Sequence, residues 1–132
     1  MSVGLLIITH NGIGSSLLKT AISIIGQNPL EVEIISVPLN CNPQRQNDKA
    51  LKLASNLDSG DGVLILTDLY GSTPSNIAHA VNAARTVNNE KSMIISGVNL
   101  PMLVRILNYP NLDLKSMTQK ALSGGQQGVI NS

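Results

Sequence analysis

A histidine and an aspartate stand directly after two apolar segments of this sequence. His10 follows the run at residues 3–9, and Asp68 follows the run at residues 63–67. Apolar runs of this length, followed by turn residues and then by a helical pattern, are typical of buried parallel strands. Sites in open α/β sheets gather at the carboxyl ends of the strands, so the two side chains are expected to meet if their strands are neighbours.

An imidazole paired with a carboxylate has a definite chemical use. A carboxylate that accepts a hydrogen bond from one ring nitrogen fixes the tautomer and leaves the other nitrogen as a nucleophile. Asp68 would orient His10 in this way and would stabilise the positive ring that forms on substitution. Two plainer interpretations stay open here: His10 as a loop residue without a role, and Asp68 as the start of an Asx turn.

The loops after the two apolar runs are suited to holding an anion. They offer backbone amides and hydroxyls, and a helix that begins at Pro74, with Thr73 as its N-cap, adds a positive dipole end. Such a nest suits a phosphoryl group better than a neutral acyl group. The residues concerned are Gly12, Gly14, Gly71, Ser72 and Thr73. Neither a Walker loop nor a Rossmann glycine fingerprint is present, so no dedicated nucleotide site is expected.

Composition indicates an aliphatic α/β protein. The 132 residues suffice for one domain over residues 1–132, and 42% are hydrophobic although Trp and Phe are absent. A core of Ile, Leu, Val, Ala and Met suits a parallel sheet between layers of helices. The formal net charge of +1, with 13% charged and 2% aromatic residues, argues against nucleic-acid binding.

The counts of cysteine and histidine restrict the chemistry further. Cys41 is the only cysteine, which excludes an internal disulfide, and nothing beside it in the sequence would activate a thiol. Two histidines, His10 and His79, make no metal constellation, so neither a metal nor another cofactor is expected. The first apolar run lacks the basic flank of a signal peptide, and no apolar segment reaches the ~20 residues of a membrane span. We therefore expect a cytoplasmic protein with no direct membrane insertion.

The elements that must position the pair alternate along the chain. Strands are predicted over residues 3–9, 32–37, 63–67 and 92–96, with a brief last strand within residues 124–130. Helices are predicted from an N-cap at Ser15–Ser16 to Gly26, over residues 44–57, from Pro74 onward, after Pro101 to about Leu107, and over residues 114–122. The strand at residues 63–67 is expected to be central. Glu33 and Ser36 interrupt the apolar run at residues 32–37, which indicates either a less buried face or a place near an edge.

This alternation predicts a fold class. Strands that alternate with helices form βαβ units with right-handed crossovers. We expect a three-layer α/β/α domain around a mainly parallel sheet of four strands, plus the C-terminal strand.

Three segments, taken together, resemble one known family. Thr9–His10 ends the first apolar run, residues 68–76 read Asp-Leu-Tyr-Gly-Ser-Thr-Pro-Ser-Asn, and residues 97–103 read Gly-Val-Asn-Leu-Pro-Met-Leu. These segments resemble motifs of the mannose-type enzyme IIA components of the bacterial phosphoenolpyruvate-dependent phosphotransferase system (PTS). They occur in the family's order and extend over most of the chain.

Two positions depart from the family pattern. Asn11 stands where a glycine usually follows the histidine, and residues 71–73 read Gly-Ser-Thr in place of Gly-Gly-Ser. Asparagine tolerates a positive φ better than other non-glycine residues, so Asn11 is expected to preserve the turn. Thr73 keeps the expected hydroxyl, whereas Ser72 is expected to restrict the backbone and to alter phosphate docking or partner choice.

The resemblance implies a phosphotransferase that uses a phosphohistidine. His10 would accept a phosphoryl group from the phosphocarrier protein HPr and pass it to a IIB component of a sugar permease. Asp68 would orient His10, and Thr73, Ser72 and nearby backbone groups at Asn11, Gly12 and Gly71 would bind the phosphoryl oxygens. The resemblance also implies a homodimer, often with an exchanged C-terminal strand.

Three further residues are candidate partner contacts. Tyr70 is one of only two aromatic residues and lies on the proposed active loop. Asn99 and Met102 lie in a segment expected to shape the pocket and the docking surface.

Other functions compatible with the same residues remain open. The chain could be a regulatory phosphoprotein that acts without a sugar permease, or the phosphoryl-donor subunit of a dihydroxyacetone kinase. A response-regulator-like receiver with Asp68 as acceptor would share the architecture, but the sequence lacks the receiver's acidic pair after the first strand and its late lysine. The sequence does not reveal which sugar, if any, is transported.

Overall fold

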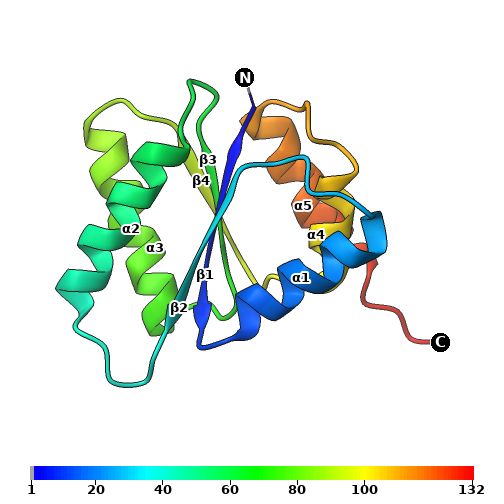
Figure 1. Cartoon of the computed structure of the whole chain (residues 1–132), viewed down its shortest axis with the longest axis horizontal. Coiled ribbons are helices and arrows are strands. Elements are labelled where there is room, and N and C mark those ends of the chain that lie inside the picture. Colours follow the sequence, from blue (N-terminus) through cyan, green and yellow to red (C-terminus); the bar gives the residue numbers. More distant parts are fainter. Residues whose placement is uncertain (1) are drawn as a thin grey trace.

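A four-stranded parallel sheet forms the centre of the molecule. The computed structural model describes residues 2–132. The strands are β1 (Gly4–His10), β2 (Val32–Val37), β3 (Val63–Thr67) and β4 (Ser92–Ser96). They are ordered β2-β1-β3-β4, and each neighbouring pair is parallel (Figure 1). The order confirms the central place of β3 and the edge position of β2, whose residues are more exposed than those of β1 and β3.

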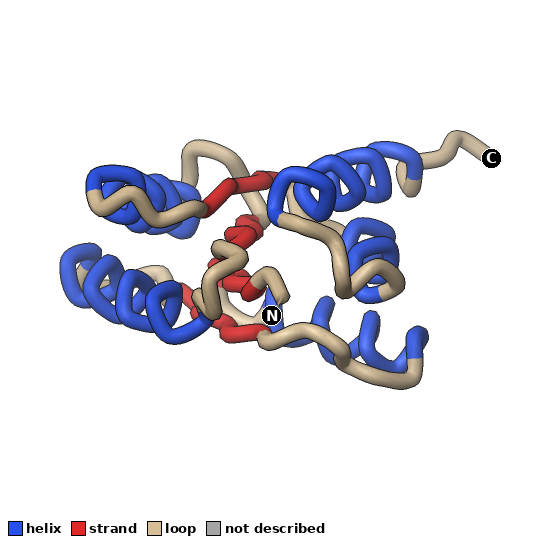
Figure 2. Tube along the Cα trace, turned by 90° about the horizontal axis from the view of Figure 1, so that it is seen from above, coloured by secondary structure: helices blue, strands red, loops and turns tan. Residues whose placement is uncertain are grey.

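Helices cover both faces of the sheet. They are α1 (Ile13–Ile25), α2 (Pro43–Leu57), α3 (Thr73–Val87), α4 (Leu100–Leu107) and α5 (Leu114–Gln127). One face carries α2 and α3, and the other carries α1, α4 and α5, as the view along the sheet shows (Figure 2). The predicted three-layer α/β/α arrangement is thus confirmed. Within residues 2–132, no helix has the length and hydropathy required to cross a bilayer.

Alternate side chains of each strand build two separate aliphatic cores. Leu5 and Ile7 of β1 join the cluster under α1, α4 and α5, whereas Leu6 and Ile8 join the cluster under α2 and α3. All four are fully buried. This period of two, with apolar side chains on both faces, explains why the segment reads as a continuous apolar run.

Two helix boundaries differ by more than two residues from the sequence-based prediction. Helix α1 begins at Ile13 rather than after Ser15–Ser16, because Gly12 takes the N-cap position with a left-handed φ of 83°. Helix α5 continues to Gln127, so the predicted last strand is wrong for residues 124–127. In this single chain, residues 128–132 form no strand either. Exchange of that segment between two subunits stays a prediction.

The extended α5 is explained by close packing between α4 and α5. A side chain on Gly124 would lie 2.7 Å from Cβ of Arg105, and one on Gly125 would lie 2.8 Å from Cε of Met102. Glycine weakens a helix by about 1 kcal/mol in isolation. Here the absent side chains allow the two helices to approach, and this packing outweighs the low propensity.

A buried arginine ties α3 to the loop before β3. Arg85 is 0% exposed, and its Nη2 donates to Oδ2 of Asp58 at 2.6 Å and to the carbonyl oxygen of Lys91 at 3.0 Å. Burial acts to raise the pKa of Asp58, but the hydrogen bond from Arg85, together with those from the amides of Gly60 and Gly62, outweighs it and lowers this pKa. The carboxylate therefore stabilises the folded chain.

We expect Asp58→Ala to lower the free energy of unfolding by about 2 to 3 kcal/mol at neutral pH, because the guanidinium of Arg85 stays buried without its main partner. Urea denaturation measures the loss. The matched control is Asp48→Ala, an exposed carboxylate bonded to Gln44, with an expected change within about 0.5 kcal/mol.

The loss on Asp58→Ala is also expected to depend on pH. A carboxyl group whose folded-state pKa lies below its ordinary value of 3.8 stabilises the fold fully above that value, and the stabilisation disappears as the pH falls through the folded-state pKa. The difference between the wild type and Asp58→Ala should therefore shrink in acid. A difference that is constant between neutral pH and pH ~2 would contradict the assigned ion pair.

Candidate functional site

His10 and Asp68 meet at the carboxyl ends of the two central strands. Because β1 and β3 are neighbours, Asp68 can reach across to His10. Its Oδ2 lies 2.8 Å from His10 Nδ1 and accepts a second hydrogen bond from the His10 amide at 3.0 Å. The sequence-based prediction that these side chains come together is confirmed, and their chemical roles remain predictions.

The charge of Asp68 determines which ring nitrogen of His10 has a free lone pair. The side chain of Asp68 is 10% exposed and that of His10 is 37% exposed. Burial acts to raise the pKa of Asp68, but hydrogen bonds from the ring and amide of His10 outweigh it and hold the pKa below its ordinary value. An ionised carboxylate only accepts hydrogen bonds, so in the neutral imidazole the ring proton is assigned to Nδ1. Nε2 is left with a lone pair.

The turn after β1 uses a different residue from the predicted one. Asn89 is the only non-glycine residue with a positive φ in the described chain, so Asn11 does not adopt the left-handed conformation expected of it. Gly12 does, with φ 83°, and a side chain there would meet nothing within 4 Å. The left-handed conformation is thus required at Gly12 and not at residue 11. This explains why an asparagine is accommodated next to His10.

The loop after β3 also corrects two predictions. Ser72 is the N-cap of α3 and has φ −86° and ψ 174°, an extended conformation open to any residue, so serine imposes no restriction there. Its hydroxyl donates to the carbonyl oxygen of Leu69 at 2.6 Å. Thr73 is not the N-cap but the first residue of α3, and it is exposed. The left-handed position of this loop is Gly71, with φ 83°.

The three predicted partner contacts have different surroundings. Tyr70 is 77% exposed, with the ring of His79 edge-on at 6.0 Å between centroids. Asn99 caps α4, since its Oδ1 accepts from the amide of Met102 at 3.0 Å, and its Nδ2 donates to the carbonyl oxygen of Gly125 at 3.1 Å. Met102 is only 3% exposed, so the structure gives it a packing role in place of the predicted contact.

Several exposed apolar residues beside the pair were not predicted as site residues. Leu39, 95% exposed, follows β2 two residues after Val37, which is paired with His10. Leu69 is 61% exposed and Ile13 is 42% exposed, both in or next to the turns beside His10. Each is an apolar residue in or next to a turn rich in polar residues or glycine, and the sequence alone does not show whether such a residue packs inward or faces solvent. The hydroxyl of Thr9 could not be singled out from the sequence either, because its contact with the amide of Gly14 in α1 depends on how the helix packs on the strand.

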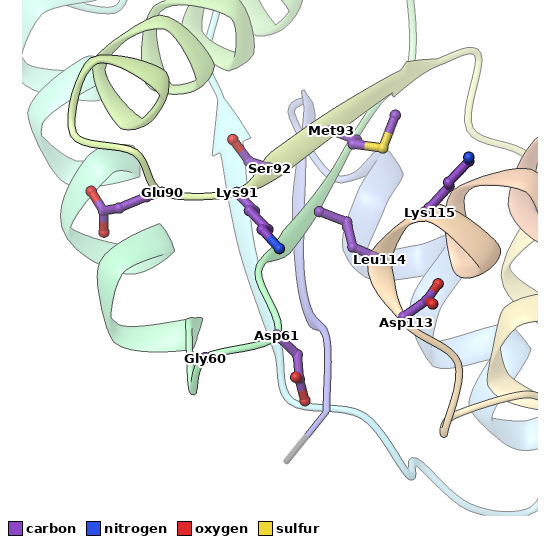
Figure 3. A pocket seen from close by; sticks show the side chains of 9 residues that line it. All are labelled: Gly60, Asp61, Glu90, Lys91, Ser92, Met93, Asp113, Leu114 and Lys115. Carbon is purple, nitrogen blue, oxygen red and sulfur yellow. The ribbon is translucent and has the colours of Figure 1, made fainter.

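A sizeable cavity lies away from this site. It has a volume of about 460 Å³ and is formed by the loop before β3, the start of β4 and the start of α5 (Figure 3). Because these segments surround the amino ends of the strands, this cavity is at the opposite edge of the sheet from His10. Among residues 2–132, no group of three or more His, Cys, Asp or Glu side chains is placed to hold a metal ion.

Known proteins share this sequence pattern and fold. The family EIIA-man, described as "PTS system fructose IIA component", matches residues 4–121. The mannose-specific EIIAB component of the PTS from Escherichia coli K12 is 32% identical over 133 residues, covering 98% of this chain and 39% of that protein. The chain thus spans about two fifths of the length of the curated relatives that it matches.

Solved structures show the same architecture. The mannose/sorbose-specific IIA subunit of the phosphotransferase system from Enterococcus faecalis superposes with a TM-score of 0.85 at 20% identity, covering 100% of this chain and 96% of that one. The PTS IIA protein associated with the fucose utilization operon of Streptococcus pneumoniae has a TM-score of 0.72 at 26% identity, covering 99% and 96%. Given the family match over residues 4–121, the chain belongs to the mannose-type IIA family of the sugar phosphotransferase system.

Proposed function

We propose that this chain is a phosphoryl carrier in which His10 accepts a phosphoryl group from phospho-HPr and passes it to a IIB component. Proteins of the IIA family are phosphotransferases in general. The observation that carries the proposal is the 2.8 Å contact between His10 Nδ1 and Asp68 Oδ2, which leaves Nε2 as the nucleophilic atom of a partly exposed ring.

The transfer can be written with its bonds balanced. The lone pair of His10 Nε2 attacks the phosphorus of the donor phosphohistidine, and the donor P–N bond breaks with its electron pair returning to the donor imidazole. A P–Nε2 bond forms, while the proton on Nδ1 stays in the hydrogen bond to Asp68. The negative carboxylate stabilises the positive phosphorylated ring, and transfer to the acceptor reverses the same step.

The loops beside His10 supply groups that would hold the phosphoryl oxygens. The turns at Gly12 and Gly71 lead into α1 and α3, whose first-turn amides have no acceptor within their own helices. Helix N-termini attract anions. The exposed hydroxyl of Thr73 would add a donor, as would backbone amides near Asn11 and Ser72. The site would act by position and electrostatics, without a metal.

Exposed apolar side chains beside the site would receive the partner proteins. Tyr70, Leu69 and Leu39 are each more than 60% exposed. An apolar patch that surrounds a reactive group is typical of a protein-binding surface. The name of the E. coli relative, an EIIAB component, supports a IIB protein as the acceptor.

A homodimer is proposed as well. Strand β4 lies at an edge of the sheet, and Val129 and Ile130 of the C-terminal segment are 78% and 74% exposed. Pairing of this segment with a second subunit would bury these side chains and cover a strand edge.

Reconstitution of the relay tests the proposed function. The chain is incubated with enzyme I, HPr and labelled phosphoenolpyruvate, and we expect stoichiometric labelling that is acid-labile, base-stable and dependent on HPr. Addition of a IIB protein should discharge the label. No labelling, with an HPr preparation that phosphorylates another IIA protein in parallel, would overturn the proposal. Label that no IIB protein removes would instead favour the regulatory role.

A further inference from the structure

The hydroxyl of Thr9 joins the end of β1 to the start of α1. Thr9 is 0% exposed. Its Oγ1 donates to the carbonyl oxygen of His10 at 2.8 Å and accepts a hydrogen bond from the amide of Gly14 at 2.8 Å. One buried hydroxyl therefore contacts both the residue that carries the ring and the first turn of the helix that follows.

This contact replaces a helix cap that the local sequence does not provide. The N-cap of α1 is Gly12, which has no side chain, and the helix has no local side-chain cap. The amide of Gly14, at the second helical position, is one of those that an N-cap side chain normally accepts. Thr9 accepts it from the neighbouring strand instead.

Close packing makes the contact specific. A Cβ atom on Gly14 would lie 2.8 Å from Cγ2 of Ile7 and 3.0 Å from Oγ1 of Thr9, so only glycine allows the helix to come this near to the strand. Together with the bond from the His10 amide to Asp68, the contact fixes both peptide groups of His10: the N–H through Asp68 and the carbonyl through Thr9.

We propose that Thr9 is a positioning residue for phosphoryl transfer at His10, an inference that rests on the proposed function. By holding the turn of residues 10–13 at both ends, its hydroxyl sets the direction of the His10 ring and of the first-turn amides of α1 toward the phosphoryl group. Thr9 itself does not contact the partner, because it is buried. Misplacement of a reacting group lowers the rate of the chemical step and leaves the affinity for the partner protein unchanged.

The test compares Thr9→Val with Thr9→Ser. Valine fills the space of threonine but neither donates nor accepts, whereas serine keeps the hydroxyl. We expect Thr9→Val to lower the maximal rate of phosphoryl transfer from phospho-HPr about tenfold or more, with the KM for phospho-HPr unchanged. Thr9→Ser should recover most of the rate. Thr118→Val is the matched control, because Thr118 is a buried threonine of α5 whose hydroxyl donates to its own helix at 2.7 Å.

NMR spectroscopy supplies a readout that does not depend on transfer. In Thr9→Val, the Gly14 amide should exchange faster and the His10 ring signals should shift, while Thr118→Val leaves both as in the wild type. The proposal is overturned if Thr9→Ser is as slow as Thr9→Val, or if Thr9→Val keeps the wild-type rate. A wild type that accepts no phosphoryl group would overturn the proposed function instead. The positioning role of Thr9 would then be decided by the NMR signals alone, and unchanged signals in Thr9→Val would refute it.

Discussion

The His10→Ala variant is expected to accept no phosphoryl group. Alanine removes the Nε2 lone pair on which the P–N bond would form, and no neighbouring group of similar nucleophilicity replaces it in the proposed mechanism. Labelling from phosphoenolpyruvate through enzyme I and HPr should fall to background. The fold should be unaffected, because the His10 side chain is 37% exposed and lies at the end of β1. Circular dichroism and thermal unfolding check this.

The chain offers a matched control for His10→Ala. His79 is the only other histidine, is also exposed, and holds its Nδ1 2.8 Å from the carbonyl oxygen of Ser75. If labelling required only an accessible imidazole, His79→Ala would lose part of the label. We expect His79→Ala to reach full labelling. Labelling that survives His10→Ala and disappears in His79→Ala would move the phosphorylation site and refute the proposed one.

The strands and the pairing of His10 with Asp68 could be predicted from the sequence because both depend on a strong, simple pattern. Buried parallel strands are apolar on both faces, and their carboxyl ends share one edge of the sheet. When two apolar runs each end in a polar residue, the two polar side chains are therefore predicted to lie close together if the strands are neighbours. The 2.8 Å contact between the side chains is a consequence of β1 and β3 being neighbours.

The start of α1 and the end of α5 could not be predicted, because tertiary contacts determine them. The hydroxyl of Thr9 caps α1 from the preceding strand, so the serines at residues 15–16, which are the best local caps, are not needed. Gly124 and Gly125 read as a helix end but are retained within α5 by close packing on α4. Propensity is a weak guide wherever a contact of this kind competes with it.

In the loops after β1 and β3, the sequence also did not show which residue adopts the left-handed conformation. Sequence comparison with the family pattern drew attention to Asn11 and Ser72, but the left-handed conformations fall on Gly12 and Gly71. A motif shows which residue types occur, and it does not show which of them has the unusual φ. Both departures from the pattern are therefore compatible with the backbone that the site uses.

Replacement of Asp68 by asparagine is expected to slow phosphoryl transfer by about 10²- to 10⁴-fold, the range seen when an orienting carboxylate loses its charge. The neutral side-chain amide of asparagine cannot compensate the positive charge of the phosphorylated His10 ring. In addition, Oδ1 of Asp68 is buried with no hydrogen-bond partner among the described residues. An asparagine that turns its oxygen toward His10 therefore buries an unpaired NH₂ group, and one that turns its NH₂ toward His10 favours a proton on Nε2, the wrong atom.

Single-turnover transfer from phospho-HPr measures this effect, since it separates the chemical step from partner binding. The control is Asp61→Asn, which changes the carboxylate before the opposite end of the same strand, β3, and should transfer at the wild-type rate. Nitrogen-15 NMR of the His10 ring reports the tautomer and so distinguishes the two orientations of the asparagine, since the proton leaves Nδ1 only where the NH₂ group faces the ring. A wild-type rate in Asp68→Asn would remove Asp68 from the mechanism, because a carboxylate that compensates the charge of the ring must affect the rate when its own charge is removed.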